Sequence, residues 1–162
     1  DDVVLDSTYS VYCFKFINIH PETANTTNLT FNFSDDGGSS YDVTKSSTAF
    51  QTGHAEDNSS AFFGYDAGSD LAQGTGVQSI FTGLDGDTDH GGCGTLHLFD
   101  PSSTTFVKHF MATMHGVTYD YAYSLYTAGY GNTTSAIDAI QFKMSADEIQ
   151  GGKIKLFGIK DS

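Results

Sequence analysis

The residues of this sequence whose types and spacing could do chemistry begin with three aspartates at alternate positions, Asp85, Asp87 and Asp89. Calcium takes oxygen ligands, and carboxylates at alternate positions of a loop turn toward one centre. The match is incomplete, because His90 stands where an EF-hand has its glycine and Leu96 where it has its bidentate glutamate. We therefore predict a solvated, exposed acidic loop over residues 84–94 and keep a calcium site as the alternative.

A second group of possible metal ligands overlaps the first and consists of His90, Cys93 and His97. Imidazole and thiolate are zinc ligands. However, His97 belongs to an alternating strand pattern and Cys93 follows two glycines, so surface or pairing roles are the preferred interpretation. For Cys13 and Cys93 we favour two free thiols over a disulfide. No cofactor is predicted.

A third candidate is a comb of aromatic rings at alternate positions, Tyr119, Tyr121 and Tyr123. Rings of this kind stack on sugar faces in carbohydrate-binding modules. The chain has no tryptophan, and the comb could equally face the core or a neighbouring subunit. Packing is the preferred interpretation, and glycan binding is the alternative.

No motif predicts catalysis. The chain has no Gly-x-Ser-x-Gly elbow and no phosphate-binding loop, and the pair Gly74 and Gly76 lacks the third glycine of a dinucleotide fingerprint. We therefore expect a protein that is not an enzyme.

The charge of the chain argues against nucleic acid as a partner. Seven lysines, no arginine and 20 acidic residues give a formal net charge of −13, which repels phosphate. The sequence also lacks the ~18 consecutive apolar residues of a membrane-spanning helix. Neither nucleic acid nor a membrane is expected to bind.

The composition predicts an all-β protein of one domain spanning residues 1–162. Thirteen Phe and nine Tyr are interspersed with Gly, Ser, Thr, Asn and Asp, and no helical period of any length occurs. We expect about eight strands in a single two-sheet antiparallel jelly-roll sandwich.

The strand patterns differ in clarity along the chain. Residues 11–19 have apolar side chains at both parities, which predicts a strand buried on both faces. Residues 29–50 are predicted to form a β-hairpin around the turn residues 35–38, and residues 95–114 a second hairpin. Two further strands, with Ile140 in the first and Ile154 in the second, close the chain.

One intersheet core is expected to contain most of the large apolar residues of these strands. The residues assigned to it are Phe14, Phe16, Phe31, Phe33, Leu96, Leu98, Phe110, Ile140, Phe142, Leu156 and Phe157.

Several stretches of the chain resemble a known family. The end of the sequence, with the loop GNTTS at 131–135, the strand IDAIQF and the closing strand KIKLFGI, is similar to jelly-roll virion proteins of tailed phages of aquatic bacteria, among them cyanophages and pelagiphages. The stretches LDSTY at 5–9, FKFINIHP at 14–21, SDDGGS at 34–39, LAQG at 71–74 and residues 94–110 follow in the order that this resemblance implies.

The resemblance implies a non-enzymatic virion protein, either a capsid decoration or a tail or fibre component. Its expected partners are copies of itself and other virion proteins, and its expected location is the virion, extracellular once assembled. The alternative on the same fold is a carbohydrate- or host-receptor-binding module, with host surface glycan as the partner.

In the family that the chain resembles, a further apolar strand precedes residues like those at 5–9. A jelly roll without that strand would leave a sheet edge unpaired. We therefore expect either a fragment or a neighbouring subunit that lends a strand beside residues 11–19 or 154–159.

Overall fold

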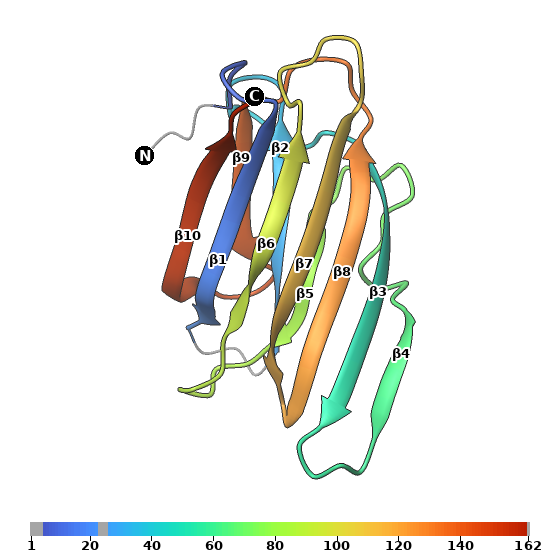
Figure 1. The fold of residues 1–162 in the computed structure, drawn as a ribbon, viewed down its shortest axis with the longest axis vertical. Helices are drawn as coiled ribbons and strands as arrows, with labels where there is room; N and C mark the ends of the chain where they lie inside the picture. Colours follow the sequence, from blue (N-terminus) through green and yellow to red (C-terminus); the bar gives the residue numbers. More distant parts are fainter. Residues whose placement is uncertain (1–4, 23–25, 162) are drawn as a thin grey trace.

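A computed structural model describes residues 5–22 and 26–161 and arranges them in two antiparallel sheets (Figure 1). The ten strands of these described residues are β1 (Val11–Pro21), β2 (Thr27–Ser34), β3 (Lys45–Ala55), β4 (Ala61–Tyr65), β5 (Gln78–Leu84), β6 (Gly92–Phe99), β7 (Lys108–Thr118), β8 (Tyr121–Gly131), β9 (Ala139–Met144) and β10 (Ile149–Ile159). The predicted all-β class is confirmed, with ten strands where about eight were expected.

The two sheets differ in size. Seven strands form a broad sheet in the order β10-β1-β6-β7-β8-β3-β4, and three form a narrow sheet in the order β5-β2-β9. In the view of Figure 1 the broad sheet is in front and the narrow sheet lies behind it. The described residues contain no helix long and apolar enough to cross a membrane.

The core lies between the narrow sheet and the broad one. Strand β7 is an example of how the sequence favours strands. Buried residues such as Phe110 and Met114 alternate with exposed residues such as Met111, and this alternation matches a pleated strand with one face in the core. Of the residues assigned to the core, seven are buried, namely Phe14, Phe16, Phe31, Phe33, Leu96, Leu98 and Phe110. Ile140, Phe142 and Leu156 are half-buried and pack against them.

The assignment of Phe157 to the core is wrong. This residue is 47% exposed and pairs with Cys13 on β1, whereas its neighbour Leu156 pairs with Phe14. Successive side chains of a strand point to opposite faces, so Leu156 and Phe157 cannot share the core. The Phe157 ring lies on the outer face, 5.6 Å from the Nζ of Lys15.

Strand β1 is not buried on both faces along its whole length. Its apolar residues occupy both parities because a bulge reverses the side-chain alternation within the strand. Lys15 and Ile17 are exposed on the outer face, while Ile19 is fully buried. Asn18, with a φ of 50°, lies between them, at the register shift in the pairing of β1 with β6. The extra residue turns Ile19 from the outer face into the core.

Only one of the two predicted hairpins forms. Strands β6 and β7 pair along their length as expected. Strand β2, by contrast, pairs with β5 and β9 in the narrow sheet, and β3 pairs with β4 and β8 in the broad sheet. The turn residues between β2 and β3 therefore belong to a crossover between sheets.

The edges of the broad sheet are β10 and β4. Strand β1, expected as an edge that a neighbour might cover, lies between β10 and β6. In the described part of the chain, no strand pairs with the outer side of β10, which contains residues 154–159. The first four residues of the chain lie outside the described part.

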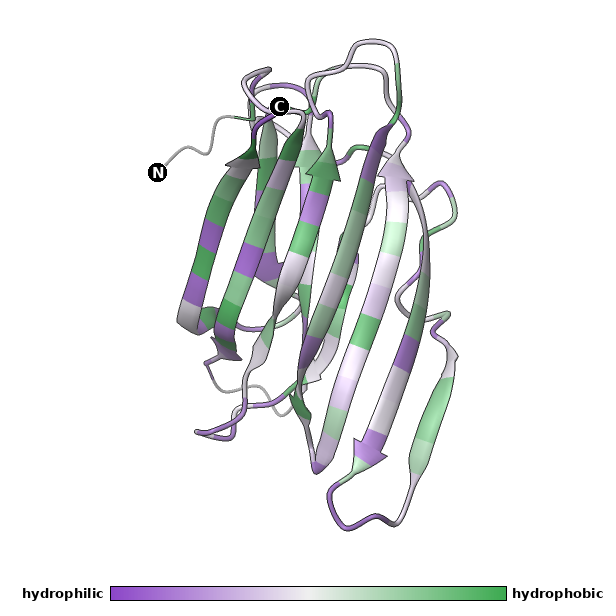
Figure 2. Ribbon diagram, in the orientation of Figure 1, coloured by the Kyte–Doolittle hydropathy of each residue, from purple (hydrophilic) through white to green (hydrophobic). Residues whose placement is uncertain are grey.

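Charge is distributed unevenly between strands and connections. None of the ten strands contains Asp or Glu, so all 20 acidic residues belong to the connections and terminal segments. Six of the seven lysines, in contrast, belong to strands. Figure 2 shows the result on β10, where hydrophilic and hydrophobic bands alternate. The sheet faces are therefore free of negative side chains.

Candidate functional site

No strand of the described residues covers the outer face of the broad sheet, because the narrow sheet packs only against the inner face. Register places its outward residues in rows across the strands: one row runs from Phe157 through Cys13 and His97 to Met111 and Ala128. Met111 is 57% exposed. Apolar side chains are therefore open on this face without a partner.

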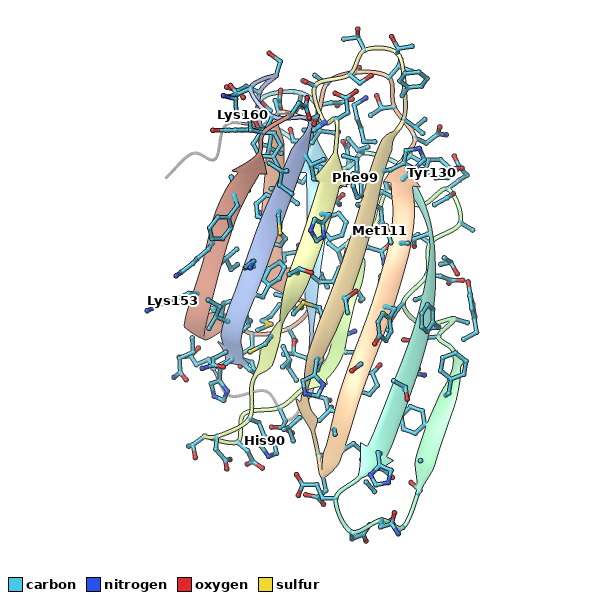
Figure 3. All side chains as sticks on the ribbon, viewed as in Figure 1. His90, Phe99, Met111, Tyr130, Lys153 and Lys160 are labelled. Atoms are coloured by element: carbon cyan, nitrogen blue, oxygen red, sulfur yellow. The ribbon has the colours of Figure 1, made fainter. Side chains whose placement is uncertain are left out.

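A shallow groove of about 580 Å³ lies on this face. Its lining comes from β3, β6, β7 and β8 and comprises Ser46, Ser47, Thr48, Phe99, His109, Phe110, Met111, Ala128, Gly129 and Tyr130. Figure 3 labels Phe99, Met111 and Tyr130, which lie on three neighbouring strands in the upper half of the sheet. The small residues of β8, Ala128 and Gly129, leave room between these larger side chains.

Next to the groove, rings from three strands form an exposed group on the same face. The rings of Phe50 and Tyr126 stack with centroids 4.7 Å apart and planes at 9°. Phe63 on β4 packs against Phe50 at 5.7 Å and is itself 75% exposed. This group and the groove together form a continuous strip of rings and hydroxyl groups from β6 to β4.

The acidic loop after β5 forms a small polar cluster at the opposite end of the sheet from the groove. Ligand atoms of Asp85, Asp87 and His90 lie within 4.8 Å of one another. Asp85 is buried, and its Oδ1 is 2.8 Å from the Nδ1 of His90. The loop is therefore only partly exposed, contrary to the prediction.

The three aspartates of the alternative calcium site are not brought together as a set. Asp85 and Asp87 lie together, but the third member of the cluster is His90 in place of Asp89. Asp85 already bonds to His90 and accepts hydrogen bonds from the backbone N–H groups of Asp87 and Tyr119. These bonds account for its burial without a metal ion.

Burial and the neighbouring carboxylates have opposing effects on the pKa of His90. Burial alone would lower its pKa, but the hydrogen bond and negative charge of Asp85, with the charges of Asp89 and Asp87, outweigh burial and raise the pKa above 6.5. The protonated imidazole thus stabilises the fold below about pH 6.5, and this contribution is lost as the pH rises through the folded-state pKa.

We therefore expect the free energy of unfolding to fall as the pH is raised above 6.5, and the fall to be absent in His90→Gln. Chemical denaturation at several pH values measures this. The matched control is His54→Gln, which removes an exposed histidine from β3. An identical pH profile for His90→Gln and the parent protein would contradict the assignment.

The tyrosine comb does not form one exposed platform. Tyr119 lies in the turn between β7 and β8 and is 60% exposed. Tyr123 is only 3% exposed, packs edge-on against Phe81 at 5.4 Å and shares hydrogen bonds with Thr82 and Gln51. Tyr121 is half-buried and bonds to Ser60. Tyr123 therefore packs in the core, as the preferred interpretation expects, and its ring is not accessible to a sugar.

Among the described residues, the zinc candidates His90, Cys93 and His97 do not form a cluster close enough to hold a metal ion. Cys93 lies beside the bulge of β1, where its Sγ is 3.2 Å from the side-chain oxygen of Asn18. His97 stacks on Phe99. Both cysteines are free thiols, as preferred from the sequence.

Two lysines are buried. The Nζ of Lys45 donates to the side-chain oxygen of Asn32 and to the carbonyl of Val43 at 2.8 Å, and that of Lys108 donates to the carbonyl of Phe106 at 2.7 Å. Burial lowers the pKa of Lys45 to about 8, and it also lowers the pKa of Lys108. Both amino groups are held by carbonyl oxygens, which offset part of the cost of desolvation.

Comparisons with protein-family models, with curated proteins and with solved structures find no match to this chain. The residues of the uncovered sheet face and sheet edges are therefore the basis for a functional proposal.

No local pattern in the sequence indicates the groove. Its residues come from four segments, around positions 46–48, 99, 109–111 and 128–130, and only strand pairing brings them together. The absence of acidic residues from the strands can be read from the sequence only when the strand bounds are known. It then distinguishes the sheet faces, which carry no negative charge, from the acidic connections.

Proposed function

We propose that this chain is a non-enzymatic structural protein of a phage virion that acts through contacts with copies of itself and with other virion proteins. The resemblance of its sequence to jelly-roll virion proteins supports a location in the phage particle, either as a capsid decoration or as a tail or fibre component. The observation that carries the proposal is that no strand of the described residues covers either edge of the broad sheet and that both edge strands are rich in exposed apolar side chains.

We also propose that the sandwich is an extended jelly roll. A jelly roll arises when a long antiparallel ribbon folds over, so that its strands pair in a nested order. Nested pairing of β1 with β10, β2 with β9 and β3 with β8 supports this topology. The hairpin of β6 and β7 would then be an addition that widens one sheet.

The edge strands have different chemistries. Strand β10 presents Lys153 and Lys155 with the exposed residues Phe157 and Ile159, both 47% exposed. Two β10 edges paired antiparallel would bring lysines close together, which is unfavourable. Strand β4 presents no lysine and carries rings that are 75% exposed at Phe63 and 59% exposed at Tyr65.

The edges are therefore complementary to each other. If β10 of one copy pairs with β4 of the next, lysines meet rings and apolar side chains meet apolar side chains. The acidic residues that flank β4, Asp57 and Asp66, then lie near the lysines of the neighbouring copy. This head-to-tail contact joins two different surfaces, so it builds rings or filaments instead of closed two-fold dimers.

We expect the protein to self-associate, and we expect Phe63→Lys to shift it toward monomer because a lysine on β4 would face the lysines of β10. Sedimentation velocity over a concentration series measures this. The matched control is Phe106→Lys, which places the same charge at a 68% exposed residue before β7. A protein that stays monomeric at high concentration, or a Phe63→Lys variant that assembles like the parent, would rule out the edge contact.

A further inference from the structure

We propose that the groove over β6, β7, β8 and β3 is a binding site for a neutral polysaccharide. This inference does not depend on the edge contacts, because the groove lies on the face of the sheet, away from both edge strands. It is carried by three features, namely the chemistry of the lining, the absence of charge and the continuity of the groove with the neighbouring rings.

The lining pairs apolar surface with groups that can form hydrogen bonds. Met111 and the rings of Phe99 and Tyr130 supply apolar contact area, and the side chains of Ser46 and Thr48 supply hydroxyl groups. Sugars have the same dual character, since their ring faces carry C–H groups and their edges carry hydroxyls. Apolar walls with a few polar groups, in a volume of about 580 Å³, are typical of ligand sites.

Two polar side chains in the groove form no hydrogen bond within the part of the chain that the structure describes. His109 and Tyr130 lie with ring centroids 6.1 Å apart. Among the described residues, neither the ring nitrogens of His109 nor the hydroxyl of Tyr130 makes a hydrogen bond. They are free to bind the hydroxyl groups of a ligand.

The ligand is neutral because the groove is uncharged. No Asp, Glu or Lys is among the lining residues, and the strands that form the groove contain no acidic residue. A formal net charge of −13 on the whole chain repels polyanions such as polyuronates and nucleic acids. A cationic ligand would find no carboxylate in the groove.

The ligand is a chain because the apolar strip continues beyond the groove. Tyr126 on β8 is two residues from Ala128 in the groove and stacks on Phe50 of β3. Phe50 in turn meets Phe63 on the edge strand β4. A polysaccharide that crosses the strands can therefore occupy the groove and rest further sugars on these rings.

Affinity electrophoresis in native gels that contain dextran, laminarin or mannan tests the proposal, with alginate as a charged counterpart. We expect at least one neutral polysaccharide to retard the protein and alginate not to. Two variants should weaken the retardation about tenfold or more, since an aromatic contact and access to the groove are lost. Tyr130→Ser removes a ring, and Ala128→Leu fills the space above β8 while leaving every other lining side chain in place.

The matched control is Tyr119→Ser, which removes an exposed ring from the turn between β7 and β8. Its retardation should equal that of the parent. The edge variant Lys153→Glu on β10 separates the two proposals, because it changes an exposed residue outside the groove and its rings, so monomers of this variant should still be retarded. No retardation by any of the three neutral polysaccharides, or equal retardation of Ala128→Leu and the parent, would overturn the inference. A change of sedimenting mass in Ala128→Leu would also overturn it, in favour of a contact between copies.

Discussion

Replacing Phe31 with alanine is expected to lower the free energy of unfolding by about 3–5 kcal/mol, the usual cost of removing a fully buried phenylalanine ring. Phe31 is 0% exposed and lies in the middle strand of the narrow sheet. Its ring meets those of Phe33 at 4.8 Å, Phe110 at 5.0 Å and Phe142 at 6.5 Å. It therefore joins residues of both sheets, and the cavity left by alanine would lie between them.

Urea denaturation at neutral pH measures this change. The matched control is Phe157→Ala, which deletes the same atoms from a ring that is 47% exposed on the outer face. We expect that control to change the free energy of unfolding by less than about 1 kcal/mol. Similar losses for Phe31→Ala and Phe157→Ala would mean that the two faces of the broad sheet have been assigned the wrong way round.

Raising the pH from 8 toward 10 is expected to stabilise the protein through Lys45. Burial lowers the pKa of this lysine in the folded state to about 8 from an ordinary value of 10.5. Below pH 8 the folded state bears the full cost of a buried charge. Between the two pKa values the folded state has lost the proton while the unfolded state retains it, so stability rises with pH.

The size of this effect follows from the separation of the two pKa values. At about 1.4 kcal/mol for each pKa unit, and with allowance for screening, the gain is about 2–3 kcal/mol. Lys108 contributes in the same direction, because burial lowers its pKa too.

Denaturation of Lys45→Met at several pH values isolates the contribution of Lys45, since methionine keeps much of the length of the side chain and has no titrating group. We expect the rise in stability between pH 8 and 10 to be smaller in this variant than in the parent. The matched control is Lys143→Met, which removes an exposed lysine from β9 and should preserve the rise. The same rise in Lys45→Met and in the parent would show that the buried amino group does not titrate in this range.

The secondary structure was largely predictable because it depends on local pattern. The alternation in residues 108–114 predicts a strand with one buried face, and β7 shows it. The pairing of β6 with β7 was also predictable, since a short turn leaves an antiparallel hairpin as the simplest connection.

Between β2 and β3, in contrast, the local pattern does not predict the strand pairing. The two glycines at 37 and 38, both at positive φ, predict a hairpin turn. A turn signal reports a change of chain direction, however, and says nothing about which sheet the next strand joins. That choice depends on β8, about 80 residues further along the chain, which pairs with β3.

The sequence by itself determined the all-β class, most of the core and the concentration of negative charge outside the strands, because these follow from side-chain type and from a period of two. Only the tertiary structure decided that Ile19 turns inward after a bulge, that Phe157 faces outward and that Lys45 is buried. The groove belongs to this second class, since its walls come from four strands that only long-range pairing brings side by side. Pairing partners distant in sequence leave no local pattern, so neither the groove nor the position of β4 at a sheet edge was visible before the sheets were assembled.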